Sequence, residues 1–149
     1  PVGRPVRYQH SQTGWFVIPI LLLFTVVAFV VASDDQVEVG VVVAILVMML
    51  AILGLGIYLS RLEVTVTDDQ VVAAFGFGKP RRAFDLKEIV DVRTVRNSWW
   101  NGWGVRKIRN GWMYNVWGLD AVQLELRSGK SFRIGTDDPD GLVEALAER

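Results

Sequence analysis

Residues 15–32 and 39–59 read WFVIPILLLFTVVAFVVA and VGVVVAILVMMLAILGLGIYL, and neither stretch contains a charged side chain. As helices rising about 1.5 Å per residue, they would be about 27 Å and about 31 Å long, close to the hydrocarbon thickness of about 30 Å. Such uniform apolarity is not typical of surface helices in a small soluble domain. We therefore expect two transmembrane helices, joined into a hairpin (15–60) by the short acidic stretch 33–38.

The charges that flank the two apolar segments predict their orientation. Arg4 and Arg7 precede the first segment without any acidic residue, and Arg61 follows the second. The stretch between the segments is acidic instead. Because basic residues accumulate on the cytoplasmic side of membranes, we expect a two-pass protein whose N-terminal tail (1–14) and C-terminus are both cytoplasmic.

Two aromatic side chains fall close to the predicted membrane surface. Trp15 and Tyr58 lie near the same interface and are candidate membrane anchors, although ordinary packing explains them equally well. Residues 30–32 also resemble a signal-peptidase site after a basic start. A second span follows at once, which favours a retained hairpin over a cleaved signal peptide.

The remaining residues, 61–149, hold most of the charged side chains and predict one small, mostly β domain. Short runs alternate apolar and polar residues with the period of a strand, and Asp, Gly and Ser separate them. The expected strands are 62–67, 70–75, 81–84, 89–96, 121–127 and 131–134. An amphipathic helix is expected to begin at Pro139, with the neighbouring aspartates as candidate N-caps.

Several short antiparallel strands followed by one C-terminal helix are typical of a split barrel of the pleckstrin-homology (PH) type. The runs LEVTVTDDQVVAAFGFGKPRRAFDLKEIVDV (62–92) and LDAVQLELRSGKSFRIGTDDPDGLVEAL (119–146) follow the helical hairpin. In this order, the features resemble a family of bacterial membrane proteins with two N-terminal helices and a bacterial PH-like domain. The resemblance covers nearly the whole chain. It implies a location in the bacterial inner (cytoplasmic) membrane, but no activity, because most members are uncharacterised.

The expected fold class is therefore a membrane α-helical hairpin plus a mainly-β (α+β) PH-like split barrel with a C-terminal helix. One segment departs from it, the aromatic-basic insertion 97–117, NSWWNGWGVRKIRNGWMYNVW. Basic residues outnumber acidic ones by nine to three between positions 79 and 109, although the net charge of the chain is +0. The candidate contact residues of the insertion are Trp99, Trp100, Trp103, Arg106, Lys107, Arg109, Trp112 and Tyr114.

Three interpretations of the insertion stay open. Indole rings settle at the headgroup level of membranes, and cations beside them attract anionic lipid. Trp, Tyr and Arg also dominate the contact energy of protein interfaces. The third interpretation is structural, a long hairpin whose tryptophans complete the barrel core.

These interpretations lead to two functional hypotheses. The first is a non-enzymatic, membrane-anchored accessory, scaffold or assembly subunit of a larger membrane protein complex. The alternative is a module that binds anionic lipid headgroups at the cytoplasmic membrane surface. The expected partners are membrane lipids and an integral membrane protein or a second copy of the chain. The zero net charge argues against nucleic acid as a partner.

Residue types that support catalysis are sparse. The chain has no cysteine, and its single histidine, His10, precedes the first apolar segment. Without a second histidine or a cysteine, neither a common zinc site nor a nucleophile–base pair can be assembled. Gly76, Gly78 and Lys79 lack the rest of a phosphate-binding loop. We therefore expect no enzymatic activity, no metal site and no cofactor.

Overall fold

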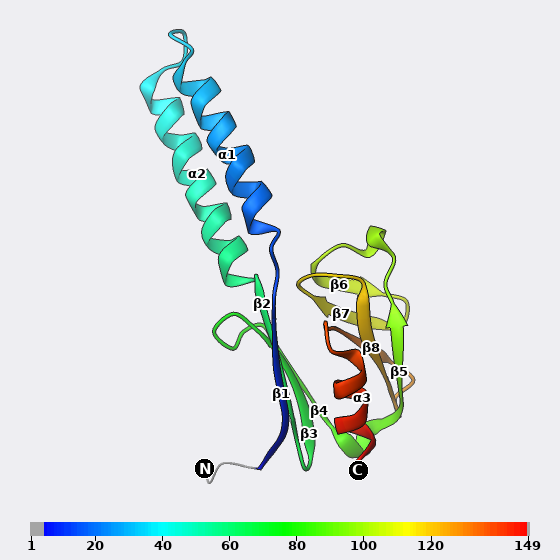
Figure 1. The fold of residues 1–149 in the computed structure, drawn as a ribbon. Coiled ribbons are helices and arrows are strands. Elements are labelled where there is room, and N and C mark those ends of the chain that lie inside the picture. Colours follow the sequence, from blue (N-terminus) through cyan, green and yellow to red (C-terminus); the bar gives the residue numbers. More distant parts are fainter. Residues whose placement is uncertain (1–4, 149) are drawn as a thin grey trace.

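The computed structural model of the protein describes residues 5–148, an α+β fold with two β-sheets and three α-helices (Figure 1). The helices are α1 (Val17–Ala32), α2 (Val39–Tyr58) and α3 (Pro139–Ala147), with 3-10 turns η1 (Leu86–Glu88) and η2 (Trp99–Asn101). The first sheet has the strand order β1-β2-β3-β4: β1 (Val6–Thr13), β2 (Arg61–Thr67), β3 (Gln70–Phe75) and β4 (Arg81–Asp85). The second has the order β5-β8-β9-β7-β6: β5 (Ile89–Arg96), β6 (Gly104–Ile108), β7 (Gly111–Asn115), β8 (Asp120–Leu126) and β9 (Ser131–Gly135).

β1 occupies the described part of the segment that we expected to be a tail (1–14), so the chain is a strand there instead. It pairs antiparallel with β2, and Thr13 lies opposite Arg61. Its sequence, VRYQHSQT, is too polar to predict a strand. Pairing with β2, whose residues alternate strongly, makes this segment a strand in the folded protein. Arg4, which contributed to the predicted orientation, lies outside the described residues.

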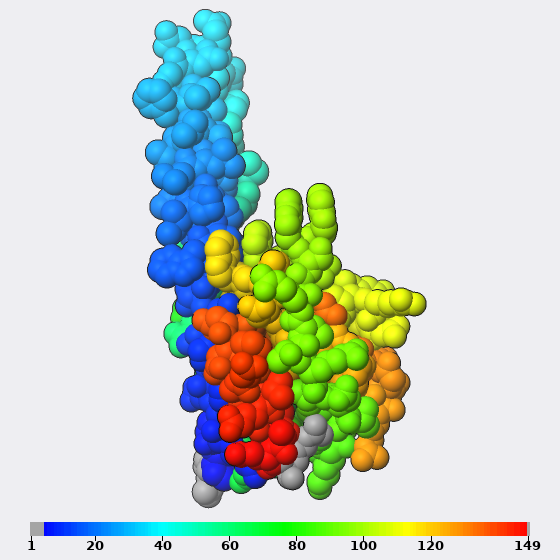
Figure 2. Space-filling view, turned by 45° about the vertical axis from the view of Figure 1, so that its right-hand side comes forward, coloured from blue at the N-terminus to red at the C-terminus, as the bar shows by residue number. Residues whose placement is uncertain are grey.

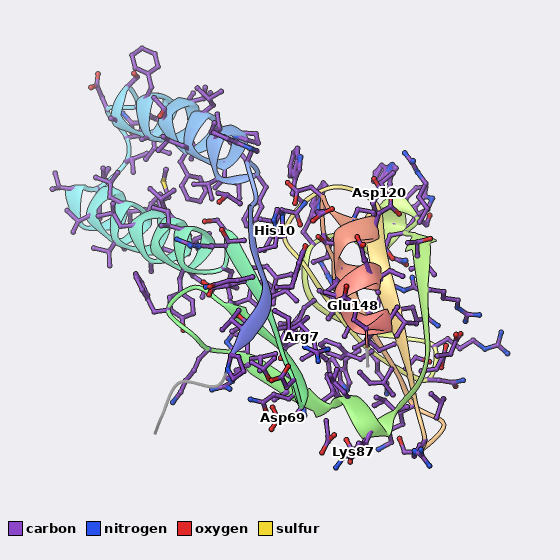
Figure 3. All side chains as sticks on the ribbon, turned by 60° about the horizontal axis from the view of Figure 1, so that its bottom comes forward. Arg7, His10, Asp69, Lys87, Asp120 and Glu148 are labelled. Carbon is purple, nitrogen blue, oxygen red and sulfur yellow. The ribbon has the colours of Figure 1, made fainter. Side chains whose placement is uncertain are left out.

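Side chains of β1 also connect the first sheet to α3. The Arg7 guanidinium donates to Asp68 Oδ1 at 2.6 Å and to the Glu148 carbonyl oxygen at 2.5 Å, so it joins the β2–β3 turn to the C-terminal end of α3 (Figure 3). His10, which we expected to be solvated, has its Nε2 at 2.5 Å from Asp137 Oδ1. β1 is therefore an integral strand of the domain.

α1 and α2 lie side by side and antiparallel, and project away from the sheets (Figure 1). Met49 is the one buried side chain in the two helices. By length and composition α2 can cross a membrane, whereas α1 is shorter. α1 does not cover the whole expected segment 15–32, because Trp15 and Phe16 form a turn instead. In this turn the Ile18 N–H donates to the Trp15 carbonyl at 3.1 Å. Within residues 5–148 one helix thus meets the criteria of a span, where the sequence predicts two.

The strands that the alternating pattern predicts are all present, and their apolar side chains meet between the two sheets. The largest fully buried side chains of this core include Phe75, Leu62, Leu124 and Ile134. α3 buries Leu142, Ala145 and Leu146 in the same core, and packs against β1, β5 and β8. As predicted, an aspartate caps α3: Asp138 accepts from the Gly141 N–H at 3.1 Å, and Pro139 occupies the first turn.

The aromatic-basic segment 97–117 is not an insertion outside the sheet, because it supplies β6 and β7. β7 runs parallel to β9, which departs from the purely antiparallel arrangement that we expected. The hairpin between β6 and β7 turns through Asn110, whose φ is 67°. Gly111 allows the close approach of β7 and β9, since a Cβ there would overlap the Ser131 carbonyl oxygen. The hairpin of the third interpretation is thus confirmed, but its tryptophans do not complete the core, because all five are exposed. The bounds of the two strands were not predicted, because three glycines interrupt the segment.

Candidate functional site

The loop between β5 and β6, residues 97–103, carries three tryptophans and is here called the aromatic loop. Trp99 and Trp100 lie in η2, with ring centroids 4.6 Å apart and planes only 16° from parallel. Their side chains are 65% and 84% exposed, so they stack on each other rather than on the core. Gly102, at φ 64°, reverses the chain after η2. The loop therefore presents a pair of indoles to the surroundings.

A second stacked pair lies beside the first. Trp103 and Trp117 have centroids 5.4 Å apart and planes 14° from parallel. Trp117 belongs to the turn before β8, so this stack connects that turn to the aromatic loop. Arg106 supports it, because its Nε donates to the Trp103 carbonyl at 3.1 Å. Trp117 was not among the predicted contact residues, although its position in the tryptophan-rich segment could have indicated it.

The helical hairpin and the aromatic loop lie at the same end of the β domain. Figure 1 shows η2 level with the start of α1, and Figure 2 shows the side chains around residue 100 projecting in the direction of the helices. The chain passes from β1 into α1 and from α2 into β2, and the Gly14 N–H donates to the Ser60 carbonyl at 2.5 Å between them. Gln12 Nε2 donates to the Trp117 carbonyl at 3.1 Å, which links the base of the hairpin to the second sheet.

The two predicted membrane anchors lie at the base of the hairpin. Trp15 is exposed just before α1, and Tyr58 is half-buried at the end of α2. The Tyr58 ring contacts Phe77, with centroids 5.9 Å apart. Phe77 is 95% exposed in the β3–β4 loop and was not predicted to belong to this surface. An apolar residue between two turn glycines is the signal that could have found it.

The three predicted basic residues do not form one cluster. Arg106 and Lys107 are consecutive in β6, so they point to opposite faces of the sheet. Arg106 lies opposite Met113, and Lys107 lies opposite Trp112. Arg109 is in the turn that follows. The three basic residues of the predicted site thus lie on the two faces of the sheet and in a turn.

Trp112 and Tyr114 share one face of β7 but differ in their surroundings. Tyr114 is only 4% exposed, and its ring lies 5.0 Å from that of Phe75 and 5.1 Å from that of Phe132. It belongs to the core, so its predicted role as a contact residue is wrong. Trp112, two residues earlier, extends beyond the core and is 44% exposed. Alternation alone could not predict where along β7 the opposite sheet ends.

The outer face of the second sheet carries a network of polar side chains around Glu125. Its carboxylate accepts from Gln123 Nε2 at 2.5 Å, Ser131 Oγ at 2.8 Å and Arg93 at 3.1 Å. The hydrogen bonds from Gln123 and Ser131, followed by the charge of Arg93, lower the pKa of Glu125 below its ordinary value. Arg133 donates to Gln123 Oε1 and to Asn97 Oδ1, which ties the aromatic loop to the sheet. We interpret this network as structural, because both carboxylate oxygens of Glu125 already accept hydrogen bonds from side chains of the same sheet.

Residues 5–148 contain no group of three or more His, Asp or Glu side chains that could hold a metal ion. The one short histidine–carboxylate contact, between His10 and Asp137, joins β1 to the start of α3. No family model matches the chain, and no curated protein is significantly similar to it.

Proposed function

We propose that the protein is a non-enzymatic, membrane-anchored PH-like module that acts as an accessory or scaffold subunit of a larger membrane protein complex. In this proposal α1 and α2 both enter the bilayer as an anchor, and the β domain carries the contact surface. Two sheets followed by a C-terminal helix in the core are compatible with the PH-like resemblance. The parallel pairing of β7 with β9 departs from the expected antiparallel arrangement. A PH-like structure related to this chain should contain the same parallel pair.

Exposed apolar surface supports the anchor. Most of the long apolar side chains of α1 and α2 are exposed, and soluble proteins rarely leave a contiguous apolar patch of that size in water. α1 alone would be about 24 Å long, and the apolar residues before it extend the segment toward a full span. The acidic turn between the helices and the basic residues beside them favour cytoplasmic termini in a bacterial inner membrane.

The stacked pair Trp99–Trp100 is the observation that carries the proposed contact with a partner. Two large indoles that stack on each other in solvent leave most of their apolar area uncovered. Tryptophans that become buried in a partner's pocket are typical centres of binding energy. Because the pair lies at the hairpin end of the domain, a partner in the same membrane could reach it (Figure 1).

Native mass spectrometry of gently solubilised membranes tests this proposal. The wild type should retain a membrane protein partner, and Trp99→Ala/Trp100→Ala should lose most of it. Trp112→Ala is the matched control, since this exposed tryptophan lies on β7, outside the aromatic loop. A wild-type chain isolated as a lone monomer would contradict the proposal.

Lipid contact is the second candidate function, favoured by the position of η2 at the same height as the start of α1 (Figure 1). Indoles at that level would meet the headgroup region, and Arg96 and Arg106 flank the loop. Lipids brominated in the upper chain should quench tryptophan fluorescence of the full chain in nanodiscs, and less so in Trp99→Phe/Trp100→Phe than in the wild type. Equal quenching in neutral and anionic discs would exclude a preference for anionic lipid.

A further inference from the structure

The two sheets separate on one side and leave a cavity of about 630 Å³. Its walls come from β4 of the first sheet, from the β6–β7 hairpin and from the β8–β9 hairpin of the second. α3 fills the space between the sheets next to β1, β5 and β8. The cavity lies elsewhere, and its volume is within the range of about 300–1,000 Å³ that small-molecule sites occupy.

Aromatic rings form the apolar part of this cavity. Phe84 of β4 and Phe132 of β9 contact each other across the sheets, with centroids 4.7 Å apart. Trp112 lies opposite Phe132 in the parallel ladder and points to the same face of the sheet. The Trp112 indole lies on the same face as the core side chains but beyond the end of the core, and it is 44% exposed. A ligand with an apolar body could cover it.

Three cations line the same cavity: Arg82, Lys107 and Lys130. They come from β4, β6 and the β8–β9 turn, so the fold brings together charges that are far apart in sequence. No acidic side chain lines the cavity, and none of the three cations forms a side-chain hydrogen bond or an ion pair within residues 5–148. Cations that converge on a cleft without counter-charges attract anions.

We propose that this cavity binds an anionic amphiphile. A phosphate or carboxylate head would contact Arg82, Lys107 and Lys130, and an apolar tail would lie against Phe84, Trp112 and Phe132. The same chemistry is available from an anionic membrane lipid and from a free amphiphile such as an alkyl phosphate. The site is separate from the aromatic loop, so it does not depend on the function proposed above.

Binding of octyl phosphate, below its micelle concentration, to the full chain in phosphatidylcholine nanodiscs tests the site. Titration calorimetry, with empty discs as the blank, should show saturable binding by the wild type. Arg82→Gln/Lys107→Gln/Lys130→Gln should weaken the affinity at least about tenfold. The control Lys79→Gln/Arg81→Gln/Lys87→Gln removes the same charge from exposed positions outside the cavity and should bind like the wild type. Equal weakening by both triple variants would overturn the site, because it would reduce the effect to net charge.

Head and tail are tested separately, and so is the source of the ligand. Inorganic phosphate and octyl glucoside should each bind far more weakly than octyl phosphate, and equal binding of the glucoside would contradict recognition of an anion. Native mass spectra with added phosphatidylglycerol distinguish the sources. A lipid adduct retained by the wild type and lost in the cavity variant assigns a membrane lipid. Octyl phosphate binding without such an adduct assigns a free amphiphile.

Discussion

Gly111 is the residue on which the parallel pair of strands depends. A Cβ at this position would overlap the Ser131 carbonyl oxygen, which is backbone and cannot rotate away. Gly111→Ala should therefore separate β7 from β9 and cost about 1–3 kcal/mol of stability, as overpacking does. For a domain of this size, Tm in mild detergent should fall by about 5 °C or more.

Gly54→Ala provides the matched control for that substitution. A Cβ on Gly54 meets nothing within 4 Å, and alanine has the higher helix propensity. Its Tm should equal or exceed that of the wild type. If both variants lost the same stability, the close approach of β7 and β9 would not be the cause.

Glu125 provides a prediction of pH dependence. Hydrogen bonds from Gln123 and Ser131, together with the charge of Arg93, lower the pKa of Glu125 from its ordinary value of 4.5. A lowered folded-state pKa contributes stability that is complete above pH 4.5 and is lost as the pH falls through the folded value. Glu125→Gln should therefore be less stable than the wild type at pH 7, and the difference in Tm should shrink toward pH 3.

Glu144→Gln is the control for this measurement, since it removes one negative charge from the exposed side of α3. Thermal unfolding of all three proteins should be followed between pH 7 and pH 3. A difference between Glu125→Gln and the wild type that stayed constant over this range would show that the network does not couple to protonation of Glu125.

At the scale of elements, the end of the chain was predictable in detail. Asp138 before Pro139 indicated the start of α3, and the Asp138 carboxylate does accept from the Gly141 N–H. It also accepts from the Tyr8 hydroxyl at 2.9 Å, a contact between β1 and α3 that no local pattern contains. Burial and this hydrogen bond to Asp138 raise the pKa of Tyr8.

Loss of the cap is therefore expected to affect two elements. Asp138→Ala should lower stability by about 0.5–2 kcal/mol through the cap alone, and further through the contact with Tyr8. Asp140→Ala, which removes a first-turn carboxylate but not the cap, should have a smaller effect. Thermal unfolding in detergent measures both, and equal losses would mean that helix charge rather than capping stabilises α3.

Other elements could not be predicted, for two physical reasons. β1 is polar, and its partner β2 lies on the far side of the hairpin in sequence, so only tertiary pairing shows it to be a strand. A hairpin in the segment 97–117 was one of the open interpretations, but the bounds of β6 and β7 were not predictable, because both strands are short and begin with a glycine, which pattern analysis assigns to loops. The candidate site was also predictable only in part. Composition indicated the tryptophans of the segment 97–117 but not whether they are exposed. The cavity could not be predicted, because it joins Arg82, Lys107 and Lys130 from three distant segments.

At the scale of the whole molecule, the helical hairpin interrupts a β-sheet. Thr13 and Arg61 are opposite each other in the β1–β2 ladder, although α1 and α2 lie between them in the chain. A fragment that begins at Arg61 would lack β1, and with it Tyr8 and the Arg7 bonds to Asp68 and Glu148. Such a fragment is therefore a poor substitute for the domain in binding experiments.

The register of β1 and β2 suggests a better substitute for the intact β domain. Deleting residues 14–60 and joining Thr13 to Arg61 through Asn-Gly would close β1 and β2 with a two-residue hairpin turn. We expect this chain to be soluble without detergent and to unfold cooperatively, because the core lies between the sheets and contains no side chain of α1 or α2, and Leu59 is the one deleted side chain that packs against it. The fragment from Arg61 onward should aggregate or show no cooperative transition. Circular dichroism and sedimentation of both would measure this, and failure of the joined chain to fold would show that the β domain requires its helices.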